Sequence, residues 1–353
     1  MAKRLLLTVG LMFVSSSSFA TPPSFLEPRC EELSFAVALA PGQDATYQVA
    51  GTLCSRGPVQ HRTIQVLLHG STYGQYYWDF PYQPQQYSYV RALTSVGFAT
   101  LALDRIGSGA SDHPDPDLIN VTSNAYVVHQ VIEQLKGGHL VVPRLGAIRH
   151  NKIILVGHSL GSIITTAVAS AYPTDVDGVI VTGFFHSAGP KMADVQAALF
   201  PAFMDPAFAS MNLPFNYFTT IPGMRGVYYR PETTDPQVLA VDEANKQTVT
   251  MAEMLESPNF IMASLGIQVP VLSVIGDYDL LFCQEPTCTA TSAAAMEPYF
   301  YSPQACLKTV VIPETGHDLN LHRTAPLFFG VAAAWSIANV GLVPEQPLPL
   351  RCR

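Results

Sequence analysis

Basic side chains are scarce in this sequence. Lysine and arginine together number 19 against 27 acidic residues, which gives a formal net charge of −8, and charged residues make up only 13% of the chain. This balance argues against nucleic acid and against an anionic membrane as partners, because both attract proteins through positive charge. With 48% apolar residues among 353, the chain has ample material for the core of one large domain.

Long apolar runs and cofactor motifs are also missing. No apolar stretch reaches the ~20 residues needed to span a bilayer, so we predict no membrane-spanning segment. The chain has neither an H-E-x-x-H pair nor a G-x-G-x-x-G after its first strand, so we expect no metal, no dinucleotide and no other cofactor. The segment 104–111 has the glycines of a phosphate loop but lacks the lysine and the following helix, and we expect it to be structural. The oligomeric state is left open.

The first twenty residues have the three regions of a signal peptide. Lys3 and Arg4 give a positive start, residues 5–14 form an apolar core, and residues 18–20 read Ser-Phe-Ala, a small-x-small cleavage site. We therefore expect residues 1–20 to be removed. The mature protein is then expected to be secreted or periplasmic.

Six cysteines, an even number, follow that leader. In an oxidising compartment an even count favours a disulfide framework, and we pair Cys30 with Cys54 because they flank the first predicted strand pair. The other four allow three connectivities, with a preference for joining Cys283 to Cys288 or to Cys306. A zinc site is disfavoured, because no second close Cys/His pair follows Cys283 and Cys288. The four are Cys283, Cys288, Cys306 and Cys352.

Short apolar runs rich in β-branched residues alternate with helical stretches from residue 64 onward. Because each run is apolar on both faces, the pattern predicts a mostly parallel sheet with helices on both sides, an α/β fold. Before these runs, 33–40 and 46–53 predict an antiparallel pair at the sheet edge. The expected strands are 64–69, 98–104, 153–157, 178–182, 271–276 and 309–313, and the expected helices are about 86–96, 121–136, 160–172 and 325–339.

The regular alternation fails between residues 188 and 266. Prolines break this part into aromatic and methionine-rich pieces, and a structureless loop of that length inside a compact domain is implausible. We interpret 188–266 as an inserted helical cap over the strand ends, where open α/β sheets hold their ligands. The core domain is then 21–187 together with 267–353.

One G-x-S-x-G motif, Gly157-His158-Ser159-Leu160-Gly161, lies between a predicted strand and a predicted helix. A serine on such a sharp turn is exposed as a nucleophile, and the helix N-terminus favours developing negative charge. We expect the glycines on either side to let the backbone reach strained angles. Ser159 is therefore the candidate nucleophile.

A second loop, residues 69–74, follows the strand predicted from residue 64. Its sequence is His-Gly-Ser-Thr-Tyr-Gly. In this position a backbone N–H can bind an oxyanion together with the N–H of the residue after the nucleophile. The candidate donors are Ser71 and Leu160.

An acid and a histidine follow later strands in the order that such a site requires. A carboxylate bonded to an imidazole fixes its tautomer, and the imidazole takes the proton of the serine. We prefer Asp279 to Asp277 as the acid, because it lies farther past the strand end, where a loop can reach the histidine. His317 is the candidate base, and His322 competes with it only weakly.

Aromatic and methionine residues are dense between residues 200 and 229. Some must pack the cap onto the core, but methionine with aromatics also makes an adaptable apolar wall. Charged residues are absent between Asp205 and Arg225, so nothing there offers a clamp for a carboxylate or phosphate. We predict a neutral, apolar ester or lactone of small to medium size as substrate. The predicted substrate contacts are Tyr73, His158 and Phe184, with His158 alternatively a packing residue.

Together these segments resemble the α/β-hydrolase superfamily, in its capped, esterase-like branch. The resemblance covers about residues 60–340 and rests on 69–70, 104–111, 157–161, 276–279 and 316–317. It implies the α/β-hydrolase fold and hydrolysis of an ester, thioester, lactone or amide without a cofactor. Related dehalogenases and epoxide hydrolases carry aspartate in place of the serine, which argues against both activities. The implied roles are Ser159 as nucleophile, His317 as base, Asp279 as acid, and Ser71 with Leu160 as oxyanion donors.

The sequence thus predicts a secreted serine hydrolase of the carboxylic-ester class that works through an acyl-enzyme. One alternative is another reaction on the same site, such as carbon–carbon bond hydrolysis, amide hydrolysis, lyase or perhydrolase chemistry, because one fold hosts many functions. Another is a non-catalytic binding protein. That alternative is disfavoured, because a binding module has no need to keep serine, aspartate and histidine together.

Overall fold

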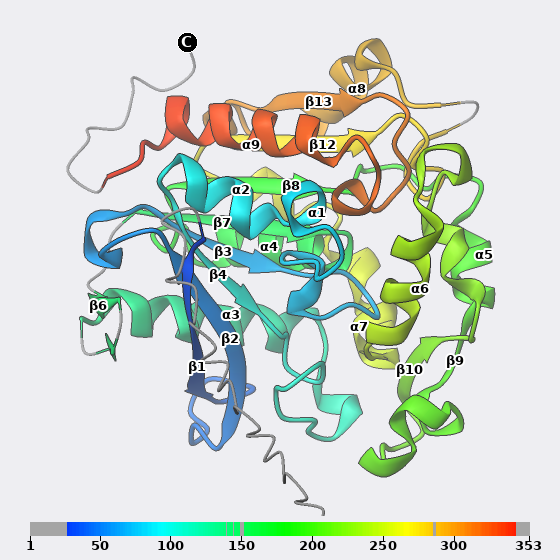
Figure 1. Ribbon diagram of the computed structural model, residues 1–353, viewed down its shortest axis with the longest axis horizontal. Helices are drawn as coiled ribbons and strands as arrows, with labels where there is room; N and C mark the ends of the chain where they lie inside the picture. The colour runs from blue at the N-terminus through cyan, green and yellow to red at the C-terminus, as the bar shows by residue number, and fades with distance from the viewer. Residues whose placement is uncertain (1–26, 139, 144, 149–151, 285–286, 344–353) are drawn as a thin grey trace, which may run out of the picture.

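The computed structural model describes residues 27–138, 140–143, 145–148, 152–284 and 287–343 (Figure 1). The predicted signal peptide and Cys352 lie outside these ranges. Within them the chain forms one large sheet between two helical layers, with an inserted segment beside it.

The central sheet has eight strands in the order β1-β2-β4-β3-β7-β8-β12-β13. β1 pairs antiparallel with β2 and β2 with β4, whereas every pair from β4 to β13 is parallel. The inner strands are buried at every residue, as a sheet covered on both faces requires. The strands are β1 (Arg29–Val37), β2 (Tyr47–Ser55), β3 (Ile64–Leu68), β4 (Ala99–Leu103), β7 (Ile153–His158), β8 (Gly178–Thr182), β12 (Val271–Gly276) and β13 (Lys308–Ile312).

Helices cover both faces of this sheet (Figure 1). On one face α2 (Tyr89–Val96) packs against α9 (Ala325–Asn339), and on the other α3 (Val121–Lys136) packs against α4 (Leu160–Ala171). Their apolar side chains join those of the strands in two buried clusters, one on each face. This architecture confirms the predicted fold class. Among the described helices, none combines the length and the hydropathy needed to cross a membrane.

The structure differs from the predicted elements in two places of the core. The helix predicted at 86–96 is divided into α1 (Pro84–Tyr87) and α2, because Ser88 between them is extended and its hydroxyl caps α2 by accepting from the N–H of Arg91 at 2.9 Å. A hairpin of β5 (Leu140–Val142) and β6 (Gly146–Ile148) precedes β7. Strands of three residues are too short to show a readable alternation.

The inserted segment, residues 188–266, is less helical than predicted. It carries a three-stranded antiparallel sheet in the order β11-β10-β9 and several short 3-10 helices beside its α-helices. Its prolines lack the N–H that a continuing helix needs, and β-branched and aromatic residues favour the middle strand. Its elements include α5 (Met192–Ala197), β9 (Leu199–Pro201), β10 (Tyr217–Thr220), α6 (Pro236–Asn245), β11 (Val249–Thr250) and α7 (Met251–Glu256).

A buried ion pair anchors the inserted segment on the core. Nε of Arg225 lies 2.6 Å from Oδ2 of Asp242, and both side chains are almost fully buried. From the core, the phenol of Tyr76 donates to Oδ1 of the same carboxylate at 2.9 Å, and the guanidinium lies over the ring of Tyr73. These contacts satisfy charges that would otherwise be costly to bury.

Two disulfides are present among the described residues. Cys30 and Cys54 are partners in the register of β1 and β2 and are joined, and Cys283 is joined to Cys288. The Cys30–Cys54 pairing was predicted and is confirmed, and Cys283–Cys288 is one of the two alternatives that the sequence left open for Cys283. Cys306 is also disulfide-bonded.

Candidate active site

Ser159 lies at the turn between β7 and α4. Its backbone has φ 54° and ψ −119°, a conformation that is costly for a non-glycine residue and persists only where the surroundings impose it. Its N–H donates to the carbonyl of Thr182 at 2.8 Å, and its carbonyl accepts from the N–H of Ser162 at 2.8 Å. The turn therefore holds a strained serine at the carboxyl end of a central strand.

The two glycines of the motif are needed for space. Neither Gly157 nor Gly161 is among the described residues with positive φ. A Cβ on Gly157 would lie 2.3 Å from the carbonyl oxygen of Gly161, and a Cβ on Gly161 would lie 2.3 Å from that of Leu68. The expected reason for these glycines is corrected accordingly. The strain falls on Ser159 itself, while the glycines let strand and helix backbones approach closely.

His317 and Asp279 come from the loops after β13 and β12. Nδ1 of His317 lies 2.9 Å from Oδ2 of Asp279, and both side chains are buried. Because an ionised carboxylate only accepts, Nδ1 carries the proton and Nε2 remains an acceptor. Asp277 instead accepts from the N–H of Thr315 at 3.0 Å. The structure thus places Asp279, and not Asp277, against the histidine.

Opposing effects act on the pKa of His317. Burial lowers the pKa, but the charge of Asp279, the hydrogen bond to it and the charge of Asp318 raise it, so that it lies above its ordinary value. An imidazole held in this way can accept a proton and keep the resulting charge paired.

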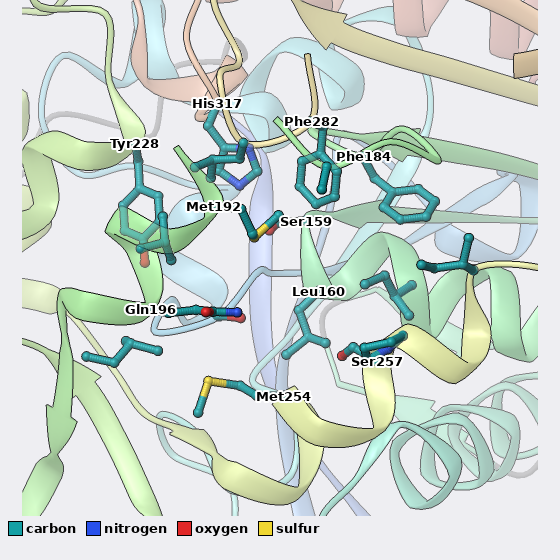
Figure 2. Close-up of a pocket in the computed structure, with 18 of the residues that line it drawn as sticks. Ser159, Leu160, Phe184, Met192, Gln196, Tyr228, Met254, Ser257, Phe282 and His317 are labelled. Carbon is teal, nitrogen blue, oxygen red and sulfur yellow. The ribbon is translucent and has the colours of Figure 1, made fainter. Parts of the chain in front are cut away.

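Ser159 and His317 open into one cavity of about 600 Å³ (Figure 2). In the described chain no hydrogen bond joins the serine hydroxyl to the imidazole, so a proton transfer needs the closer approach that a bound substrate can impose. Among the described residues, no Lys, Arg, Asp or Glu lines the cavity. Its apolar wall includes Phe184, Phe185, Met192, Phe218, Tyr228, Met251, Met254 and Phe282.

Two backbone donors point to an anion site beside the serine. The N–H groups of Ser71 and Leu160 have no acceptor within the described residues, and both residues line the cavity. A Cβ on Gly70 would lie only 3.0 Å from Cβ of Ser159, so this loop passes directly beside the serine. Free donors in such a place can stabilise negative charge that develops on a reacting oxygen.

Arg105, from the glycine-containing segment 104–111, holds that loop in place. Its Nε donates to the carbonyl of His69 at 3.1 Å, and its backbone N–H donates to Nε2 of the same histidine at 3.0 Å. Its guanidinium also pairs with the buried carboxylate of Glu253 in the inserted segment. The role of this arginine is therefore structural.

Of the three predicted substrate contacts, Tyr73 and Phe184 line the cavity and His158 does not. His158 is fully buried, and its ring nitrogens lie 3.1 Å from Oδ1 of Asp318 and 3.2 Å from Oγ1 of Thr182. The expectation is corrected for His158, because these two polar partners hold its ring inside the core.

His322, the weaker candidate for the base, is a structural residue. Its Nδ1 donates to the carbonyl of Asp318 at 2.7 Å, and its Nε2 accepts from the N–H groups of Arg230 at 3.0 Å and Gly316 at 3.1 Å. Both nitrogens are therefore occupied in shaping the loop around His317.

Two groups of described residues have the spacing of metal ligands. One is His158, His317 and Asp318, in which Nε2 of His158 faces Oδ1 of Asp318 and Nδ1 of His317 faces Asp279. The other is His129, Glu133 and Asp175. There Nζ of Lys136 lies 3.9 Å from Oδ1 of Asp175, so a lysine already balances the negative charge of this carboxylate.

Sequence reasoning missed Asp318 and several wall residues. Asp318 directly follows the candidate base, and that position was the only signal for it. Met192, Gln196 and Met254 reach the cavity from the inserted segment, whose placement no local pattern reveals.

Comparison with known proteins agrees with this architecture. A family model described as "Alpha/beta hydrolase family" matches residues 65–328, and comparison with curated proteins found no match. Among solved structures, a thermophilic esterase from Thermogutta terrifontis is 16% identical with a TM-score of 0.57, over 86% of this chain and 97% of that one. A 2-hydroxy-6-oxo-6-phenylhexa-2,4-dienoate hydrolase from Rhodococcus sp. strain RHA1 is also 16% identical, with a TM-score of 0.54 over 87% and 99%. A monoacylglycerol lipase from Paleococcus ferrophilus is 15% identical, with a TM-score of 0.51 over 87% and 98%. At these identities the structural likeness shows the fold alone.

Proposed function

Since the chain belongs to the α/β-hydrolase family, we propose that it is an exported serine hydrolase that cleaves a neutral, apolar carboxylic ester or lactone. One observation carries the proposal. A strained serine at a strand–helix turn and an imidazole bonded to a buried carboxylate open into the same uncharged cavity.

The proposed reaction proceeds in two halves. The hydroxyl oxygen of Ser159 attacks the carbonyl carbon while Nε2 of His317 takes its proton, and the N–H groups of Ser71 and Leu160 donate to the resulting oxyanion. Collapse of this intermediate breaks the ester bond, and His317 returns the proton to the leaving alcohol. Water then attacks the acyl-enzyme by the same steps and releases the acid. Asp279 keeps the imidazole in the correct tautomer throughout.

The character of the cavity supports an uncharged substrate. Aromatic, methionine and aliphatic side chains dominate its wall, and Gln196 and Ser257 are among its polar side chains. Without a lysine or arginine among its described residues, the wall offers no permanent positive charge to pair with a substrate carboxylate or phosphate. Tyr73 and Phe184 are proposed to contact the substrate beside Ser159.

Export is supported by the disulfides. Such bonds persist in oxidising compartments and are rare in the cytosol. Two of them in the described chain agree with the predicted signal peptide.

Covalent labelling tests the proposed nucleophile. A fluorophosphonate should label the purified protein once per chain, and the modified peptide should carry the label on Ser159. Product analysis by mass spectrometry on a panel of esters, lactones and carbon–carbon substrates then separates ester hydrolysis from the other reactions. A protein that is not labelled would contradict the proposal.

The preference of the enzyme for acyl chain length should reflect the apolar wall of the cavity. Across p-nitrophenyl esters of increasing chain length, kcat/KM should rise, because each buried methylene contributes up to about 0.8 kcal/mol until the cavity is full. Steady-state kinetics on four or five chain lengths measures this. A flat profile, or a preference for anionic esters, would show that the aromatic residues only pack the fold.

The Cys283–Cys288 disulfide should affect catalysis. The N–H of Cys283 donates to the carbonyl of Asp279 at 2.8 Å, and the N–H of Cys288 donates to that of Asp277 at 2.9 Å. Replacing both cysteines with serine should therefore loosen the Asp279 loop and lower kcat by roughly 10-fold, since small misplacements in an active site are costly.

The other described disulfide is the matched control for that experiment. Cys30→Ser with Cys54→Ser removes a bond between β1 and β2, and neither residue lines the cavity. It should lower the free energy of unfolding by about 2–4 kcal/mol and leave kcat unchanged. Measuring urea unfolding and kcat for both double variants separates an effect on stability from an effect on catalysis. Equal effects on kcat would count against a special role for Cys283–Cys288.

A further inference from the structure

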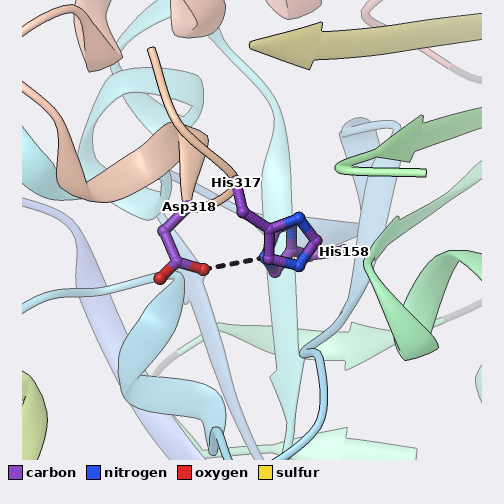
Figure 3. Close-up of side chains that lie close together, drawn as sticks. All are labelled: His158, His317 and Asp318. Atoms are coloured by element: carbon purple, nitrogen blue, oxygen red, sulfur yellow. Dashed lines mark hydrogen bonds and ion pairs between the residues drawn. The ribbon is translucent and has the colours of Figure 1, made fainter. Parts of the chain in front are cut away.

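A second imidazole and carboxylate pair lies next to the proposed nucleophile and base (Figure 3). His158 precedes Ser159 in the chain, Asp318 follows His317, and both side chains of the pair are fully buried. Nε2 of His158 lies 3.1 Å from Oδ1 of Asp318. The pair therefore joins the two segments that carry the reacting side chains, one residue away from each.

The surroundings fix the geometry of this pair. The phenol of Tyr73 donates to Oδ2 of Asp318 at 2.5 Å, so both carboxylate oxygens are engaged. Nδ1 of His158 lies 3.2 Å from Oγ1 of Thr182. The histidine ring also stacks on Tyr77, with centroids 4.4 Å apart and an interplanar angle of 12°. Neither side chain is free to turn.

Neither substrate contact nor stability accounts for the pair. His158 and Asp318 are not among the residues that line the cavity. Burying an imidazole and a carboxylate takes both out of water, and apolar residues of similar volume often stabilise a fold as well or better. The best attested use of such buried polar pairs is to select one arrangement of the chain over others.

We infer that His158 and Asp318 are positioning residues that set the approach of His317 to Ser159. The inference rests on the proposed function. Ser159 and Glu314 both have positive φ, at 54° and 53°, so both segments contain backbone that departs from regular strand and helix geometry. The ring centroids of His158 and His317 lie only 4.8 Å apart, so a shift of one ring displaces the other. A misplacement of about 1 Å can cost 100-fold in rate.

The first test is the rate at which a fluorophosphonate labels the serine. Labelling needs the hydroxyl and its base, but it does not require the true substrate to be known. His158→Phe keeps a stacked ring and removes the hydrogen bond to Asp318. We expect this variant to be labelled about 10- to 100-fold more slowly than the wild type.

His129→Phe is the matched control for that variant. Nδ1 of His129 lies 2.7 Å from Oδ2 of Asp175, and its ring stacks on Tyr172 with centroids 3.9 Å apart. The same contacts thus occur at a place that does not line the cavity. The labelling rate of His129→Phe should equal that of the wild type.

Two further variants separate positioning from stability. The double variant His158→Phe/Asp318→Leu leaves neither member of the pair buried without its partner, and Tyr73 keeps Asp242 at 3.2 Å as an acceptor. Its unfolding temperature should recover toward that of the wild type, because removing both partners is less costly than removing one. Its labelling should remain slow. Asp318→Asn keeps an oxygen that accepts from His158, so it should be labelled close to the wild-type rate, whereas Asp318→Ala should be slow.

The outcomes that contradict the inference are distinct from failure of the proposed function. Labelling of His158→Phe at the wild-type rate would overturn the inference. A double variant that recovers both its unfolding temperature and the wild-type labelling rate would also overturn it. If His158→Phe does not fold, equal labelling rates for Asp318→Asn and Asp318→Ala would overturn it instead. A wild-type protein that is not labelled at all would overturn the proposed function, and the inference with it.

Discussion

Replacing Ser159 with alanine is expected to lower kcat on an aryl ester by about 10⁴- to 10⁶-fold. The hydroxyl oxygen forms the bond to the acyl group, and no neighbouring side chain in the cavity can substitute for it at that turn. Alanine adds no atom where the backbone already has φ 54°, so the fold should be kept. Steady-state kinetics together with the unfolding temperature measure the two effects separately.

His317→Ala provides the companion measurement. It should lose about as much activity as Ser159→Ala, and the double variant should lose little more than either, because the two groups act as one unit. The control is His129→Phe, since His129 pairs with Asp175 and does not line the cavity. Losses that add up in the double variant, or substantial turnover by Ser159→Ala, would count against the proposed roles.

The core of the fold was predictable because its strands carry a strong local signal. β8 and β12 are apolar at nearly every position, and burial on both faces is the only setting that suits such runs. The helices α3 and α9 begin and end where the sequence predicted. Short elements such as β5 and β11 were missed, because their two or three residues carry no periodicity.

The candidate site was predictable wherever a residue type and a strand end coincided. Ser159, Asp279 and His317 each follow a core strand, and parallel strands bring such ends to one edge of the sheet. Partners that depend on packing between distant segments were not predictable. His158 faces Asp318 across 160 positions of sequence, and only the folded chain shows that this histidine turns away from the cavity.

In the inserted segment, too, the sequence predicted the type of residue but not the position of each side chain. Its richness in aromatic and methionine residues between residues 200 and 229 predicted an apolar wall, and Phe218 and Tyr228 do line the cavity. Phe203 and Phe215, from the same dense stretch, are 46% and 62% exposed instead. Composition identifies material for a wall, but the placement of each side chain depends on tertiary packing.

Replacing Asp279 with asparagine should produce the second large loss, roughly 10⁴-fold in kcat, with little change in KM. Asparagine keeps the size of the side chain, but its amide can donate to Nδ1 of His317 and so place the proton on Nε2, where the serine needs an acceptor. The matched variant is Asp277→Asn, two residues earlier, whose oxygen accepts from the N–H of Thr315 and not from the histidine. That variant should keep kcat close to the wild-type value.

The pH dependence of kcat/KM provides a second test of the Asp279→Asn variant. In the wild type the charge of Asp279 and its hydrogen bond raise the pKa of His317 against the lowering effect of burial. Removing them should lower this pKa, so the imidazole stays neutral to lower pH and the residual activity of the variant persists there. The acid limb of kcat/KM should therefore shift to lower pH while the plateau falls. A plateau that falls equally in Asp277→Asn, or an acid limb that does not move in Asp279→Asn, would mean that Asp279 does not support His317 as the base.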